Sequence, residues 1–107
     1  MRSLDFIQLA SEKLNEAEEL LEYNNSHVKE LSKRTVLYSI EAVAQELGVE
    51  PLNILDGLNI LPLRLWSEVL RLLEIKRMID VSTPKDALEL AREAIEIATA
   101  LILYVKF

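Results

Sequence analysis

The stretch that most constrains the fold runs from Thr83 to Phe107, because it combines the clearest helix start with the most apolar run of the chain. Thr83 can cap a helix, Pro84 suits a first helical position that needs no amide donor, and Asp86 stands three residues after the cap. Small and aliphatic residues then recur at alternating spacings of four and three: Ala87, Ala91, Ala94, Ala98, Leu101 and Val105. This spacing predicts a long helix whose small side chains let a neighbouring helix approach closely.

Composition agrees with a helical domain. The 107 residues are 50% hydrophobic and include only two glycines and three prolines, a balance that favours long helices with few turns over a many-stranded sandwich. A chain of this length can bury one core but not two. We therefore predict a single all-α domain over residues 1–107, folded as an up-and-down bundle of four long helices with one short additional helical turn.

The other helices are expected upstream of the C-terminal one. Ser3 can cap the first helix, and Ser26 can cap the second after an asparagine-rich turn. Gly48 followed by apolar Val49 predicts a left-handed helix end. Pro62 predicts the start of the next long helix. The expected spans are residues 3–23 and 26–47, a short turn at 51–57, then 62–79 and 84–107.

The residue types argue against catalysis. Cysteine is absent and His27 is the only histidine, so a thiolate or transition-metal site and a catalytic triad lack the residues that they need. We predict no catalytic residue, no metal and no cofactor, and we expect the chain not to be an enzyme. Glu41, in an apolar stretch of the second helix, is the one acid whose surroundings would need inspection.

Charge and hydropathy restrict which partners and which cellular compartment we expect for the protein. The formal net charge of −6 disfavours broad electrostatic binding to nucleic acid, and the apolar neighbours of Trp66 favour a core position over a platform for a base. The uncharged residues 97–105 are too few to span a bilayer. No charged-then-apolar leader opens the sequence, so we expect a cytoplasmic protein. Abundant Leu, Ile and Glu without Cys is a composition typical of thermophile proteins.

A helix-turn-helix motif is one possible interpretation of the middle of the chain. Ala44, Gly48 and Ile54 stand at the spacings that this motif requires. The would-be recognition stretch, residues 51–58, offers Asn53 and Asp56 but no Arg, Lys or Gln to bond base edges or phosphates. A helix end followed by a hydrophobic segment explains the same residues, so a DNA-binding regulator is the alternative and DNA is not expected as a partner.

The order of the elements resembles the HEPN superfamily. The chain has a long N-terminal helix, a tight turn, a second helix ending in Glu46-Leu47-Gly48, an apolar helix carrying Arg77, and a last helix that opens with Pro84-Lys85-Asp86-Ala87 and continues Ala91-Arg92-Glu93-Ala94. The resemblance implies a small helical bundle associated with nucleotidyltransferases, toxin-antitoxin pairs or RNA cleavage.

The nuclease motif of that superfamily is missing here. HEPN ribonucleases carry an Arg followed, after four to six intervening residues, by a His. After Arg77 those positions hold Ser82, Thr83 and Pro84. The resemblance therefore implies a member without nuclease activity, comparable to the partners of nucleotidyltransferases and to antitoxin-like or scaffolding members.

Four basic residues are candidates for binding a nucleotide or RNA. Lys29, Lys33 and Arg34 lie on the first half of the second helix, and Arg77 stands near the end of the next long helix. If these residues face a common groove, they can bind phosphate groups. The alternative is that they form solvated faces that balance the acidic first helix, because no aromatic residue is interleaved with them.

The C-terminal helix carries more apolar residues than a monomer core needs. The apolar segment 58–61 adds to this surface. We predict a symmetric homodimer, or a complex with a partner helical protein, with Leu103 and Tyr104 at the interface because they lie off the alanine stripe. The alternative is that a loop of the same chain covers these side chains.

Overall fold

The computed structural model describes residues 2–23 and 25–107, which form helices joined by short connections and include no β-strand. The α-helices are α1 (Ser3–Leu20), α2 (Asn25–Leu47), α3 (Trp66–Met78) and α4 (Pro84–Lys106), and the 3₁₀ helices are η1 (Pro51–Ile60), η2 (Leu63–Leu65) and η3 (Ile79–Val81). The prediction of an all-α chain is confirmed.

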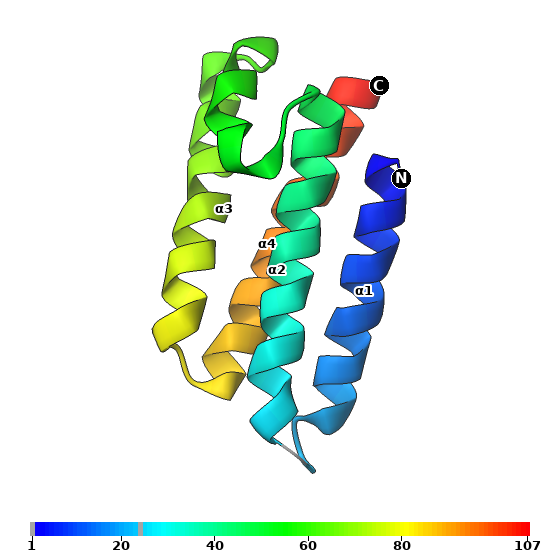
Figure 1. Ribbon diagram of the computed structural model, residues 1–107, viewed down its shortest axis with the longest axis vertical. Helices are drawn as coiled ribbons and strands as arrows, with labels where there is room; N and C mark the ends of the chain where they lie inside the picture. Colours follow the sequence, from blue (N-terminus) through cyan, green and yellow to red (C-terminus); the bar gives the residue numbers. More distant parts are fainter. Residues whose placement is uncertain (1, 24) are drawn as a thin grey trace.

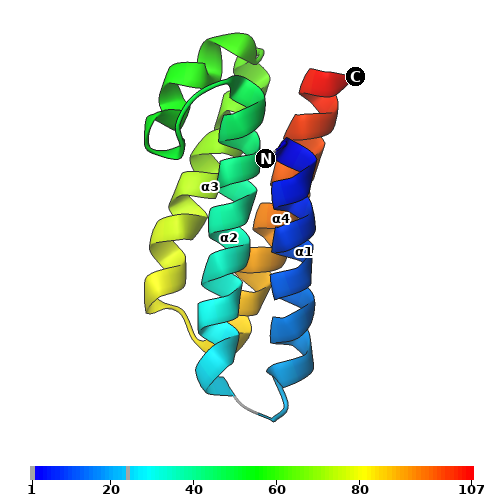
Figure 2. The ribbon, with the colours of Figure 1, turned by 45° about the vertical axis from the view of Figure 1, so that its right-hand side comes forward.

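Helices α2 and α4 lie at the centre of the molecule (Figures 1 and 2). Helix α1 packs on one side of this pair and α3 on the other, and consecutive long helices run in opposite directions. The two chain ends lie at the same end of the molecule, which measures 43 × 25 × 20 Å (Figure 1). This layout gives α3 neighbours on one side only.

Small side chains bring α1 close to α2. Ser3, Ala10 and Ala17 recur every seven residues and are buried. The Thr35 hydroxyl donates a hydrogen bond of 3.2 Å to the Ala10 carbonyl, and the Ser3 hydroxyl donates one of 2.6 Å to Glu46 Oε2. A hydroxyl on one helix can reach a main-chain carbonyl of the other only when the two backbones approach closely, so the small residues set this distance.

The alanine stripe of α4 packs into the same core from the other side. Its four alanines are fully buried: Ala87, Ala91, Ala94 and Ala98. They belong to one hydrophobic cluster with Val36, Ile40 and Val43 of α2. The prediction that this stripe admits a neighbouring helix is therefore confirmed. In the described part of the chain, the buried Ser32 hydroxyl of α2 lacks a hydrogen-bond partner. Ser32 therefore contributes to the packing through its small size.

Two helix ends follow their sequence signals. The Thr83 hydroxyl accepts a hydrogen bond of 3.2 Å from the Asp86 N–H, and Pro84 is the first residue of α4. After α2, Gly48 takes a φ of +74°, and the N–H of Val49 donates to the Ala44 carbonyl at 3.0 Å. This is the left-handed helix end that Gly48 and Val49 predict.

The first helix differs from its prediction at both ends. The capping residue is Arg2 and not Ser3, and the Asp5 carboxylate accepts the Arg2 N–H at 2.9 Å. Ser3 is instead buried against Glu46 of α2, because it belongs to the small-residue contact. Helix α1 ends at Leu20, before the expected Tyr23. Ser26 lies inside α2, which starts at Asn25, and Asn24 lies outside the described residues.

The connection between α2 and α3 is more helical than predicted. Helix η1 covers Pro51–Ile60, so it extends through most of the expected loop at 58–61. Pro62 caps the 3₁₀ helix η2 in an extended conformation, and α3 begins only at Trp66. The Trp66 indole is half-buried against the core and donates a hydrogen bond of 3.1 Å to the Leu61 carbonyl. This bond holds the connection against α3.

Replacing Ala94 by Leu should lower the free energy of unfolding by about 1 to 3 kcal/mol, because the added methylenes overpack the contact with α2. Ala100 of α4 is exposed and supplies a matched control. Ala100→Leu should leave the stability within about 0.5 kcal/mol of the wild type. Chemical denaturation measures both, and equal effects of the two substitutions would show that the stripe does not set the helix distance.

Candidate functional site

A cluster of basic side chains lies where the first half of α2 meets the end of α3. Lys33 Nζ stands 2.9 Å from Asp80 Oδ1, and Lys29 Nζ donates a hydrogen bond of 2.7 Å to the Asp80 carbonyl. The charge of Lys76 also acts on the Asp80 carboxylate. Three lysines from two helices therefore converge on one acidic residue, and their combined charge exceeds that of Asp80.

The Lys33–Asp80 pair remains charged over the whole neutral range. The hydrogen bond from Lys33 lowers the pKa of Asp80 below its ordinary 3.8 and raises the pKa of Lys33 above 10.5. The stabilisation of the fold by the Asp80 carboxylate is thus present above pH 3.8 and is lost as the pH falls through the lowered pKa of Asp80. The stabilisation by the Lys33 ammonium group is present below pH 10.5 and is lost as the pH rises through the raised pKa of Lys33. Both groups are exposed, so water screens the pair.

A groove runs along α3 beside this cluster, and we name it the α2/α3 groove. It consists of two adjoining hollows of about 590 and 190 Å³ that share Lys76 and Asp80. The remaining lining residues are Lys33, Val36 and Leu37 of α2, Leu70, Leu73, Glu74 and Arg77 of α3, and Ile79 of η3. The groove therefore combines aliphatic walls with cations near the end of α3.

Three of the four predicted basic residues lie in this region. Lys29 and Lys33 share Asp80, and Arg77 lines the groove. Arg34 instead pairs with Glu30 one turn earlier on α2, at 3.5 Å. Lys76, which stands next to Arg77 in the sequence, also belongs to the cluster, because its charge acts on Asp80. Nucleotide or RNA binding by these residues stays a prediction.

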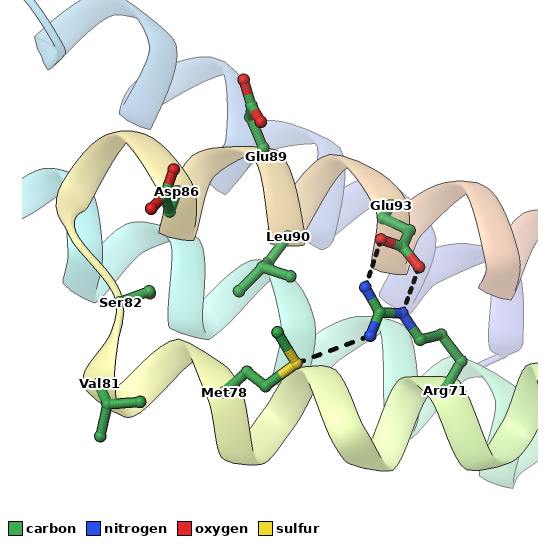
Figure 3. A pocket seen from close by; sticks show the side chains of 8 residues that line it. All are labelled: Arg71, Met78, Val81, Ser82, Asp86, Glu89, Leu90 and Glu93. Atoms are coloured by element: carbon green, nitrogen blue, oxygen red, sulfur yellow. Dashed lines mark hydrogen bonds and ion pairs between the residues drawn. The ribbon is translucent and has the colours of Figure 1, made fainter.

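A second groove lies on the other flank of α3, between α3 and α4, with a volume of about 590 Å³. Figure 3 shows Arg71 reaching across it from α3 to Glu93 of α4, with Met78 beside the guanidinium group. Arg71 Nε lies 2.6 Å from Glu93 Oε2, and Arg71 Nη2 lies 3.0 Å from Oε1. Arg71 also pairs with Glu74 on its own helix.

The Arg71–Glu93 pair fastens α3 to α4. Its two parallel hydrogen bonds raise the pKa of Arg71 and lower the pKa of Glu93 below its ordinary 4.5. Each group is the main polar partner of the other, so neither is poised to exchange a proton near neutral pH. The arrangement is suited to holding the helices together and not to acid-base chemistry.

The residues that could support acid-base or metal chemistry do not lie together. His27 is exposed in the first turn of α2, and Glu41 is half-buried further along the same helix. Within residues 2–23 and 25–107, no three His, Cys, Asp or Glu side chains are grouped so that they could hold a metal ion. None of the helices in the same residues has both the length and the apolar character that crossing a membrane requires.

The segment expected to enter a DNA groove in the helix-turn-helix interpretation is not an α-helix. Pro51–Ile60 is a 3₁₀ helix with a kink at Asn53. Ala44 and Ile54 are buried, and a Cβ added to Gly57 would stand 2.9 Å from Leu47 Cβ. Helix η1 thus packs tightly on the end of α2, and the spacing of Ala44, Gly48 and Ile54 serves this packing.

The predicted interface residues lie near the end of α4. Leu103 is 49% exposed and Tyr104 is 47% exposed. The guanidinium of Arg64 in η2 stands 5.7 Å from the centre of the Tyr104 ring, within the range of a cation–π contact. Tyr104 and Phe107 also line a hollow of about 380 Å³ together with Ile60 of η1. This apolar surface thus joins α4 to the connection before α3.

No protein-family model, no curated protein and no solved structure matches the chain.

Replacing Glu93 by Gln should lower the free energy of unfolding by less than about 1 kcal/mol at neutral pH, because the pair is partly exposed and screened by solvent. The lowered pKa of Glu93 means that this difference is present above pH 4.5 and fades as the pH falls below that value. Denaturation of both proteins from pH 7 to pH 2 measures the effect. Glu89→Gln, at an exposed position of α4, is the control, and a Glu93→Gln effect that persists at pH 2 would contradict the assignment.

Proposed function

We propose that this chain is a non-catalytic assembly module of the HEPN-like type, built as an up-and-down bundle of four long helices, and that it forms a symmetric homodimer. A nucleotidyltransferase or a toxin-antitoxin component is the kind of protein with which such a module would act, in a role related to nucleotides or RNA. The observation that carries the proposal is the exposed apolar surface at one end of the molecule.

The apolar surface is concentrated in two segments, residues 52–63 and residues 103–107. Seven of the thirteen large hydrophobic side chains that are exposed among the described residues belong to these segments: Leu52, Leu55, Ile60, Leu63, Leu103, Tyr104 and Phe107. Phe107 is 94% exposed and Leu63 is 73% exposed. Ile60 of the first segment lines one hollow with Tyr104 and Phe107 of the second, and exposed apolar side chains that gather in this way are typical of a protein interface.

A second copy is the partner that we propose for this surface, because it presents the same exposed aromatic and aliphatic side chains. Aromatic and aliphatic side chains of α4 and η1 surround a hollow into which a side chain of another copy can insert. A two-fold axis would place each copy's projecting Phe107 against the other copy's hollow and bury both at once. A stable interface of this kind buries about 800 Å² on each partner.

Sedimentation equilibrium tests the dimer. The wild type should sediment as a dimer in the micromolar range, and Leu103→Glu should shift it to a monomer with the helix content largely unchanged, because a carboxylate would be buried without a partner. Tyr23→Glu is the matched control, since Tyr23 is 84% exposed and follows α1 at the opposite end of the molecule. A wild-type protein that remains monomeric at high micromolar concentration would overturn the proposal.

A further inference from the structure

We propose that the α2/α3 groove is a docking site for an acidic amphipathic helix of another protein. The inference concerns a different surface from the apolar end, so it does not depend on the dimer. It rests on the way in which aliphatic and cationic side chains are arranged along the groove.

The groove presents aliphatic side chains that the core leaves partly uncovered. Leu70 of α3 is 50% exposed and lines the larger hollow together with half-buried Leu73, and Leu37 of α2 is 45% exposed and lines the smaller one. Leu70 and Leu73 are three residues apart, so they share one face of α3. A ligand that only carried charge would leave these side chains in water, so the ligand must bring apolar groups of its own.

The cations lie at one end of the groove. Lys33, Lys76 and Arg77 line it near the end of α3, and the acids beside them are Asp80 and Glu74. Glu74 is already paired with Arg71, and Asp80 is shared by Lys33 and Lys29. Among the ion pairs of the described residues, none within 4.0 Å involves Lys76 or Arg77, although the charge of Lys76 also acts on the Asp80 carboxylate. A chain with a net charge of −6 thus keeps an excess of positive charge here.

The dimensions suit a short helix. From Leu70 to Asp80 the groove follows ten residues of α3 and η3, which is about 15 Å or roughly three helical turns. A docked helix with apolar residues at i, i+3 and i+7 could cover Leu37, Leu70 and Leu73. Its acidic residues would belong in its first turn, where the helix dipole favours them. This places its N-terminal end over Lys76 and Arg77, so that it runs antiparallel to α3.

Other occupants fit the groove less well. A nucleic acid strand would meet the cations, but no aromatic side chain lines the groove to stack a base, and the net negative charge of the chain opposes a polyanion. In a second copy, the acidic helix α1 already packs its apolar side against α2 and α4. Only its acidic face would be available for the groove, and that face would leave Leu37, Leu70 and Leu73 without apolar partners.

A selection experiment tests the proposal. The probe is a display library of helices on a rigid helical scaffold, with the residues of one exposed face randomised and the intact protein as target. We expect enriched sequences to combine leucines at i, i+3 and i+7 with acidic residues in the preceding turn. Binding of an enriched peptide should fall about tenfold or more with Leu70→Glu and also with Arg77→Glu, and it should weaken as the salt concentration rises.

Matched controls separate the groove from general effects of charge. Leu4→Glu makes the same change at a 52% exposed leucine of α1, and Lys85→Glu reverses a charge at an exposed position of α4. Both variants should bind the enriched peptides like the wild type. If Leu70→Glu fails to fold, Arg77→Glu together with Lys76→Glu provides the test, because both residues are exposed.

Three results would overturn the proposal. The first is a library from which no sequence is enriched. The second is a set of enriched peptides whose affinity is unchanged by Leu70→Glu and Arg77→Glu. The third is a single-stranded RNA of about 20 nucleotides that binds more tightly than any enriched peptide and loses its affinity in Arg77→Glu, which would assign the groove to RNA. None of these results bears on the dimer, because the test variants at Leu70, Lys76 and Arg77 lie outside the two apolar segments, residues 52–63 and 103–107, that the dimer would bury.

Discussion

The close approach of α2 to both of its neighbours is the contact on which the rest of the structure depends. Serine and alanine of α1 and the alanine stripe of α4 bring two helices against α2, and the Thr35 hydroxyl reaches the Ala10 carbonyl at 3.2 Å. Small side chains bury little area each, but they let long stretches of three helices share dispersion contacts. Because α2 is covered on both sides, its first half can carry polar groups only at the remaining edge, where Lys29 and Lys33 lie.

This arrangement explains why α3 is the helix with exposed flanks. With α2 and α4 at the centre and α1 on the far side, α3 packs through one face, which carries Val69, Leu72 and Ile75. An ion pair lies on each of its two flanks. Arg71 meets Glu93 on the α4 side, and Asp80 meets Lys33 on the α2 side. The groove with apolar walls and an excess of cations follows from this position.

The sequence predicted the features that are determined locally. The start of α4, the alanine stripe and the left-handed end at Gly48 each depend on a few neighbouring residues, and each was found where expected. The 3₁₀ character of Pro51–Ile60 was not predicted, because packing on the end of α2 determines it. The convergence of Lys29, Lys33 and Lys76 on Asp80 could not be read either, because it depends on the register between two helices. Arg34, from the same stretch of α2, pairs with Glu30 on its own helix.

Native-state hydrogen exchange tests the central place of α2 most directly. If the small-residue contacts hold the core together, the amides of α2 and of the buried part of α4 should exchange most slowly, at a rate set by global unfolding. The amides of α3, which is fastened at its flanks by two exposed ion-pair contacts, should exchange faster through partial opening. Amides of α3 that are as protected as those of α2, or α2 amides that exchange before them, would contradict this account.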